Sequence, residues 1–99
     1  MTYADSTERA ALINGLRGMA DYLEANPEIP TPIYSDMLTF PPNGEWAEMR
    51  AEIDRIAARL GTTAHLTGGG HYTASRRFGP VEYRTVAIPH KNDSSKESE

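Results

Sequence analysis

Cationic and aromatic side chains gather in the last third of this sequence. Arg76, Arg77 and Phe78 are consecutive, and Arg84 follows on the next predicted strand. Guanidinium groups bind carboxylates and phosphates, and aromatic rings offer stacking surfaces, so this mixture is typical of a binding surface. The predicted binding residues are Arg76, Arg77, Arg84, Tyr72, Tyr83, His71, Gly69 and Gly70. The alternative is an ordinary hairpin whose aromatic rings face the core and whose arginines pair with Glu82 or with helix carboxylates.

A glycine run lies just before His71. Gly68, Gly69 and Gly70 could form a nest of backbone N–H groups for an anion, with Arg76 or Arg77 supplying positive charge. The run fits neither a Walker A loop nor a dinucleotide-binding motif. A flexible hairpin loop is the simpler interpretation.

Candidate catalytic and metal-binding residues are few. The sequence contains no cysteine, and its three histidines lack the close spacing of common zinc sites. Ser75 and His71, taken with Asp36 or Asp54, show neither a nucleophile elbow nor an oxyanion loop. We therefore expect no catalytic residue, metal or cofactor, and we do not expect an enzyme.

Charge is unevenly distributed along the chain. The net charge is -4, made up of -5 in residues 1–61, +3 in residues 62–91 and -2 in residues 92–99. A basic island on an acidic protein favours an unidentified protein partner over nucleic acid, although nucleic acid stays possible. We expect a monomer or a homodimer, since an exposed sheet edge could support self-association.

The N-terminal half of the sequence predicts an amphipathic helix. Asp5 and Glu8 have the spacing of a capping box, so the helix should begin near Ser6. Apolar residues recur at spacings of four, three and four and predict a stripe that faces the core: Leu12, Leu16, Met19 and Leu23. The helix should end at Asn26-Pro27.

The remaining pattern predicts strands and a second helix. Residues 33–40 indicate a strand, and Asn43 could cap a helix that ends at Gly61. Residues 62–67, 71–78 and 81–88 then follow a period of two, with turns at the glycine run and at Gly79-Pro80. The predicted class is α+β, in the order helix, strand, helix, strand, strand. Both helices should pack on one face of a small antiparallel sheet in two layers.

We expect one domain over residues 1–90 and a disordered polar tail over residues 91–99, which contains no apolar side chain. No signal-peptide pattern and no long apolar run are found. Together with the lack of cysteine, this favours a cytoplasmic protein without a membrane partner.

Three stretches of the sequence carry a resemblance to other proteins. They are residues 12–27 (LINGLRGMADYLEANP), residues 52–57 (EIDRIA) and residues 70–84 (GHYTASRRFGPVEYR). The chain resembles a group of short uncharacterised proteins of high-GC actinobacteria and their phages over residues 10–88. The excess of arginine over lysine, eight to two, agrees with a high-GC genome. The resemblance implies a host or phage origin and no activity.

These observations lead to one functional hypothesis and two alternatives. The leading hypothesis is a small interaction protein that binds a macromolecule through the basic hairpin of Arg76, Arg77 and Arg84. The alternatives are a nucleic-acid-binding protein of winged-helix type and a small-ligand module that uses the glycine loop. The acidic residues of the second helix argue against a helix that enters a nucleic-acid groove.

Overall fold

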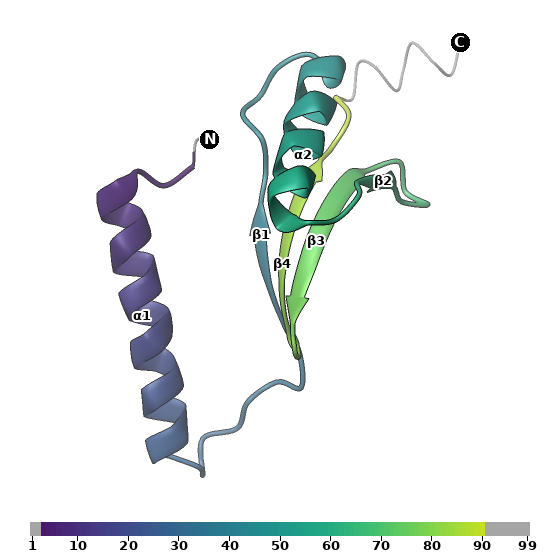
Figure 1. Cartoon of the computed structure of the whole chain (residues 1–99). Helices are drawn as coiled ribbons and strands as arrows, with labels where there is room; N and C mark the ends of the chain where they lie inside the picture. The colour runs from purple at the N-terminus through teal and green to yellow at the C-terminus, as the bar shows by residue number, and fades with distance from the viewer. Residues whose placement is uncertain (1–2, 91–99) are drawn as a thin grey trace. The chain divides into compact units, whose positions relative to one another are not determined.

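The computed structural model describes residues 3–90 and confirms the α+β class (Figure 1). Its elements are α1 (Ser6–Ala25), β1 (Ser35–Thr39), α2 (Trp46–Leu60), β2 (His65–Leu66), β3 (Tyr72–Phe78) and β4 (Val81–Ala87). The β-structure predicted on both sides of the glycine run is thus two separate strands, β2 and β3. The described chain divides into two compact units, one over Tyr3–Ile33 and the other from Tyr34 onward.

Helix α1 begins where the sequence predicts. The Asp5 carboxylate accepts from the Glu8 backbone N–H at 2.8 Å, and the Glu8 carboxylate accepts from the Asp5 N–H at 2.9 Å. The helix ends before Asn26, its C-cap, and Pro27 follows. No residue of α1 is buried within its own unit, and the predicted packing of its apolar stripe against the sheet stays a prediction.

Helix α2 begins two residues later than an Asn43 cap would place it. Its N-cap is Glu45, whose backbone N–H donates to the Glu48 carboxylate at 3.2 Å. Asn43 is followed by Gly44, and glycine is a poor first residue for a helix because of its backbone entropy. The helix ends as predicted at Gly61, which adopts the left-handed conformation at a φ of 76°.

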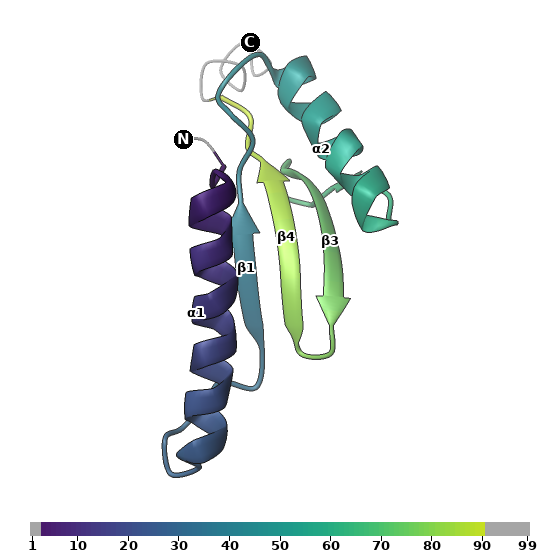
Figure 2. The same cartoon turned by 60° about the vertical axis from the view of Figure 1, so that its left-hand side comes forward.

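The sheet is mixed, which corrects the predicted antiparallel arrangement. Its strand order is β1-β4-β3-β2, and β1 runs parallel to β4 from the pair Ser35 and Val81 to the pair Thr39 and Thr85. The other two pairings are antiparallel. Figure 2 shows β4 between β1 and β3. Parallel pairing needs a long crossover connection, and α2 with β2 and β3 supplies it between β1 and β4.

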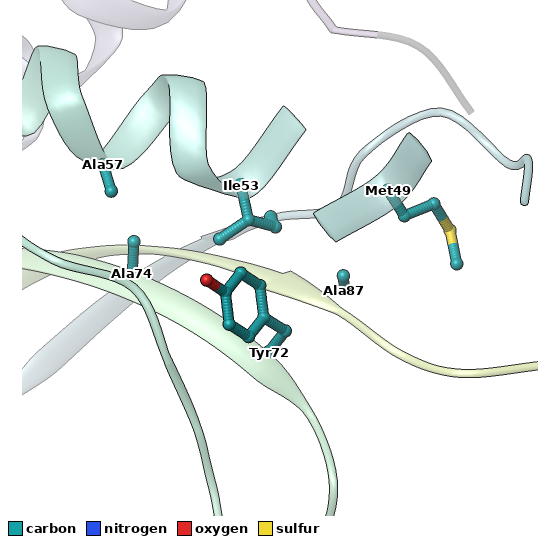
Figure 3. Packing of buried hydrophobic residues seen from close by; sticks show 6 residues of the cluster. All are labelled: Met49, Ile53, Ala57, Tyr72, Ala74 and Ala87. Atoms are coloured by element: carbon teal, nitrogen blue, oxygen red, sulfur yellow. The ribbon is translucent and has the colours of Figure 1, made fainter. Parts of the chain in front are cut away.

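The core lies between α2 and one face of the sheet. Figure 3 shows the Ile53 side chain directed from α2 toward Tyr72 and Ala74 of β3. The buried apolar cluster consists of Met49, Ile53, Ala57, Tyr72, Ala74 and Ala87, with Trp46, Leu60 and Ala64 packed against it. Ile53 is completely buried, so this contact organises the unit that begins at Tyr34.

Strand alternation defines two faces of the sheet. The core face carries Tyr72, Ala74, Arg76 and Phe78 of β3, opposite Ala87, Thr85, Tyr83 and Val81 of β4. The other face, called the outer face below, carries Ser75, Arg77, Glu82 and Arg84. The alternation of β4 therefore separates Val81 and Tyr83 from Glu82 and Arg84.

Two predictions about domain limits gain no structural evidence. The disordered tail over residues 91–99 lies outside the described residues, and the single domain over residues 1–90 stays a prediction.

Candidate functional site

The turn that joins β3 to β4 presents apolar and cationic side chains together. Phe78 and Val81 lie directly opposite each other across the turn, and they are 58% and 49% exposed. Gly79, at a φ of 63°, makes the tight reversal between them possible. Arg76, Arg77, Phe78 and Val81 are called the hairpin tip below.

The two arginines of the hairpin tip lie on opposite faces of the sheet. Arg76 shares the core face with Phe78, and its guanidinium carbon lies 5.4 Å from the centroid of the Phe78 ring. Its Nη1 also donates to the Leu60 carbonyl at 3.4 Å. Arg77 lies on the outer face, 5.4 Å from the centroid of the Tyr34 ring. Each arginine thus has an aromatic neighbour.

A charged network occupies the outer face beside Arg77. Arg84 forms an ion pair of 3.2 Å with Asp36 of β1 and another of 3.2 Å with Glu82 of its own strand. The Tyr34 hydroxyl donates to the Glu82 carboxylate and accepts from Arg84 Nη2 at 3.3 Å. We call Tyr34, Asp36, Glu82 and Arg84 the outer-face network.

The electrostatics of the outer-face network follow from these contacts. The hydrogen bond from Tyr34, supported by Ser75 and Arg84, lowers the pKa of Glu82 below its ordinary value. The same bond to Glu82 raises the pKa of the Tyr34 hydroxyl. At neutral pH Glu82 is therefore ionised and Tyr34 is a donor, so the network ties β1 to β4 through charge and hydrogen bonds.

Three of the predicted binding residues are held by other contacts within the chain. Arg84 is held within the outer-face network and is not available as a free cation. Tyr72 lies in the core and donates to Asp54 at 2.5 Å, an interaction that raises the pKa of its hydroxyl. Tyr83 is half-buried and lies 3.1 Å from the Thr39 hydroxyl.

The residues of the glycine loop lie at the other end of β3 from the hairpin tip. Gly69 and Gly70 precede β3, and the Gly70 N–H donates to the Thr67 carbonyl at 3.0 Å. The N–H of His71 donates to the Thr67 hydroxyl at 3.2 Å. One of the three glycine N–H groups predicted for an anion nest, that of Gly70, is thus used within the loop. The structure does not bring Gly69, Gly70 or His71 together with Arg76 and Arg77.

The candidate catalytic residues are also held apart by other contacts. Asp54 accepts from Tyr72, and Asp36 pairs with Arg84, so neither carboxylate is directed at His71. Within residues 3–90, no group of three histidine or acidic side chains could hold a metal ion. No helix in that same range is long and apolar enough to cross a membrane.

Sequence reasoning missed Tyr34 and Val81 as members of this region. Tyr34 carried a usable signal, because it alternates with Asp36 and Leu38 at the period of a strand. Its contact with Glu82, 48 residues away, depends on the parallel pairing of β1 with β4. That pairing has no local sequence signal.

Comparisons with protein-family models, curated proteins and solved structures found no match to this chain.

Proposed function

We propose that this chain is a small protein-binding module whose contact surface is the hairpin tip. The observation that carries the proposal is the exposure of Phe78 and Val81 between two arginines, neither of which forms an ion pair within residues 3–90. Aromatic and arginine side chains are enriched where protein interfaces gain most of their binding energy. The tip therefore suits a protein surface that offers an apolar pocket flanked by carboxylates.

The available charge favours a protein partner over nucleic acid. Arg84 is neutralised by Asp36 and Glu82, which leaves Arg76 and Arg77 as the cations of the tip. Binding to a phosphate backbone normally uses many more cationic contacts on a surface of positive potential. The whole protein instead has a net charge of -4.

The edge of β3 on the side of β2 also offers backbone N–H and C=O groups to which a partner strand could bind. β2 pairs with β3 only at Tyr72 and Thr73. In the part of the chain that the structure describes, no strand covers the rest of this edge down to Phe78. An extended segment of a partner could add to this edge while its side chains contact the tip.

The proposal assigns a binding role without catalysis, in the cytoplasm. The support for a role without catalysis is that the titratable side chains beside the tip bind one another, Glu82 with Tyr34 and Arg84. The proposed origin in an actinobacterium or its phage rests on the resemblance of residues 10–88 alone.

Affinity capture with matched variants tests the proposal. The wild-type protein, Phe78→Ala, the double variant Arg76→Ala with Arg77→Ala, and the control Arg59→Ala are each immobilised and exposed to lysate of the source organism. Arg59 is an exposed arginine of α2, so its loss removes one positive charge outside the tip, against two in the double variant. We expect one protein whose recovery falls at least about tenfold with both tip variants and is unchanged with the control.

Two results would contradict the proposed function. One is capture that is equal for the wild type and the tip variants. The other is recovery that disappears after nuclease treatment, because the contact would then run through nucleic acid. Circular dichroism of each variant verifies that the fold is intact.

A further inference from the structure

Within the unit Tyr3–Ile33, no residue of the apolar stripe of α1 is buried, and no proposed function uses this stripe. Leu12 is 49% exposed, Leu16 40% and Met19 56%, and Ile13 and Tyr22 beside them are 37% and 57% exposed. Isolated exposed apolar residues are common, but a continuous stripe along one helix marks a surface that is covered in the functional state.

The spacing of the stripe matches the seam of a two-helix contact. Leu12, Leu16, Met19 and Leu23 follow the alternation of four and three residues that keeps side chains facing a partner helix. The helix has 20 residues, about 30 Å in length, which gives room for all four positions.

The order of these four residues makes the stripe complementary to itself in the antiparallel direction. When two copies run in opposite directions, Leu12 of one lies against Leu23 of the other, and Leu16 against Met19. The two-fold symmetry repeats both contacts, so the pair has four apolar layers. Each layer joins side chains of similar volume.

The charges of α1 also favour the antiparallel direction. The helix has no basic residue in its last turn, so its negative C-terminal end and Glu24 lack a cation on their own chain segment. Arg9 occupies the same face one turn before Leu12. Antiparallel pairing places Arg9 of one copy next to the C-terminal end of the other. Parallel pairing would instead place Arg9 against Arg9.

We propose that α1 is a homodimerisation helix, which binds α1 of a second copy in antiparallel orientation through Leu12, Leu16, Met19 and Leu23. The dimer then carries two hairpin tips, so the inference extends the proposed function without depending on it. A partner with two binding sites would be held more tightly by the dimer than by either copy alone.

Two measurements test the dimer. Sedimentation over a range of concentrations compares the wild type with Leu16→Glu and with Asn14→Glu, which adds the same charge on the opposite side of α1. We expect a wild-type dimer and an unchanged Asn14→Glu dimer. Leu16→Glu should raise the dissociation constant at least about tenfold, because it buries an unpaired carboxylate at the seam.

Disulfide formation tests the direction of the helices. The chain has no cysteine, so Leu12→Cys and Leu23→Cys each introduce one thiol without background. Antiparallel pairing predicts that a mixture of the two variants forms mainly the mixed disulfide. Parallel pairing predicts that each variant links to itself.

Each alternative outcome overturns a stated part of the inference. A wild-type monomer at every concentration excludes the dimer, whether or not Leu16→Glu changes the melting temperature. Dominant self-linked disulfides exclude the antiparallel direction. Equal dissociation constants for Leu16→Glu and Asn14→Glu exclude the stripe as the interface. Loss of capture by the tip variants with an intact dimer would leave this inference standing independently of the proposed function.

Discussion

Helices α1 and α2 carry apolar residues at nearly the same spacings, yet only α2 buries them within its own unit. Met49, Ile53 and Ala57 of α2 are buried, whereas α1 has no buried residue. The two helices also end differently, since α2 stops at a left-handed glycine and α1 at Asn26 with a φ of -129°. The comparison shows that an amphipathic pattern predicts a covered face and does not say which surface covers it.

The largest expected contrast comes from truncating one apolar side chain in each helix. Ile53→Ala should lower the free energy of unfolding by about 3 kcal/mol, because it opens a cavity at a completely buried position. Leu16→Ala in dilute protein should cost less than about 1 kcal/mol, since Leu16 is already exposed to water. Urea unfolding followed by far-UV circular dichroism, which reports on both helices, measures both. Equal losses of unfolding free energy in the two variants would contradict the difference in burial between the two helices.

The two helix ends allow a second test of the same contrast. Gly61→Ala should lower the free energy of unfolding by about 1 kcal/mol, since alanine is strained at a φ of 76°. Asn26→Ala introduces no such strain and removes only the bond from its side-chain amide to the Tyr22 carbonyl. Thermal unfolding by circular dichroism should show the larger shift for Gly61→Ala.

Acid should destabilise the unit that begins at Tyr34, because it protonates the Glu82 carboxylate. Its folded-state pKa is lowered, above all by the Tyr34 hydrogen bond, so the stability it contributes is present above its ordinary pKa. That contribution is lost as the pH falls through the lowered folded-state value. Glu82→Gln should therefore flatten the acid side of the stability profile, measured by urea unfolding at several pH values.

Glu24→Gln in α1 is the matched control for this profile. It removes an exposed carboxylate from the other unit. If the stability of Glu82→Gln depended on pH as that of the wild type does, this would contradict the stabilising role of the outer-face network.

The smallest effect on the stability of the unit that begins at Tyr34 is expected from removing the cap of α1. Asp5→Ala removes the acceptor of the Glu8 N–H and should cost the helix about 1 kcal/mol. Amide hydrogen exchange of the first turn of α1 should accelerate, while the unfolding transition followed by Trp46 fluorescence stays in place. A shift of that transition would show that the α1 cap supports the sheet.

Local signals predicted the elements of this fold well. The capping box of Asp5 and Glu8, the stop at Gly61 and the turn at Gly79-Pro80 depend on residues close in sequence, and all three are found. Non-local features were missed for a physical reason. The parallel pairing of β1 with β4 and the clustering of Tyr34 with Glu82 arise from contacts across more than 40 residues.

The candidate site shows the same division. Adjacent Arg76, Arg77 and Phe78 were found from the sequence, because the exposed hairpin tip is a local structure. The leading hypothesis grouped Arg84 with them as a binding residue, and the alternative paired the arginines with Glu82. The structure pairs Arg84 with Glu82 and also with Asp36, a residue on a strand whose neighbour the sequence does not reveal.

The central place of β4 also affects how the chain can acquire its structure during synthesis. β4 contacts both β1 and β3, but it is the last of the four strands to be translated. Until it leaves the ribosome, β1 has no partner strand, and α2 lacks Ala87 from its core. The high contact order of this pairing favours slow, late folding. Chaperones that bind nascent chains would therefore meet a chain in which β2 and β3 can already pair while β1 has no partner strand.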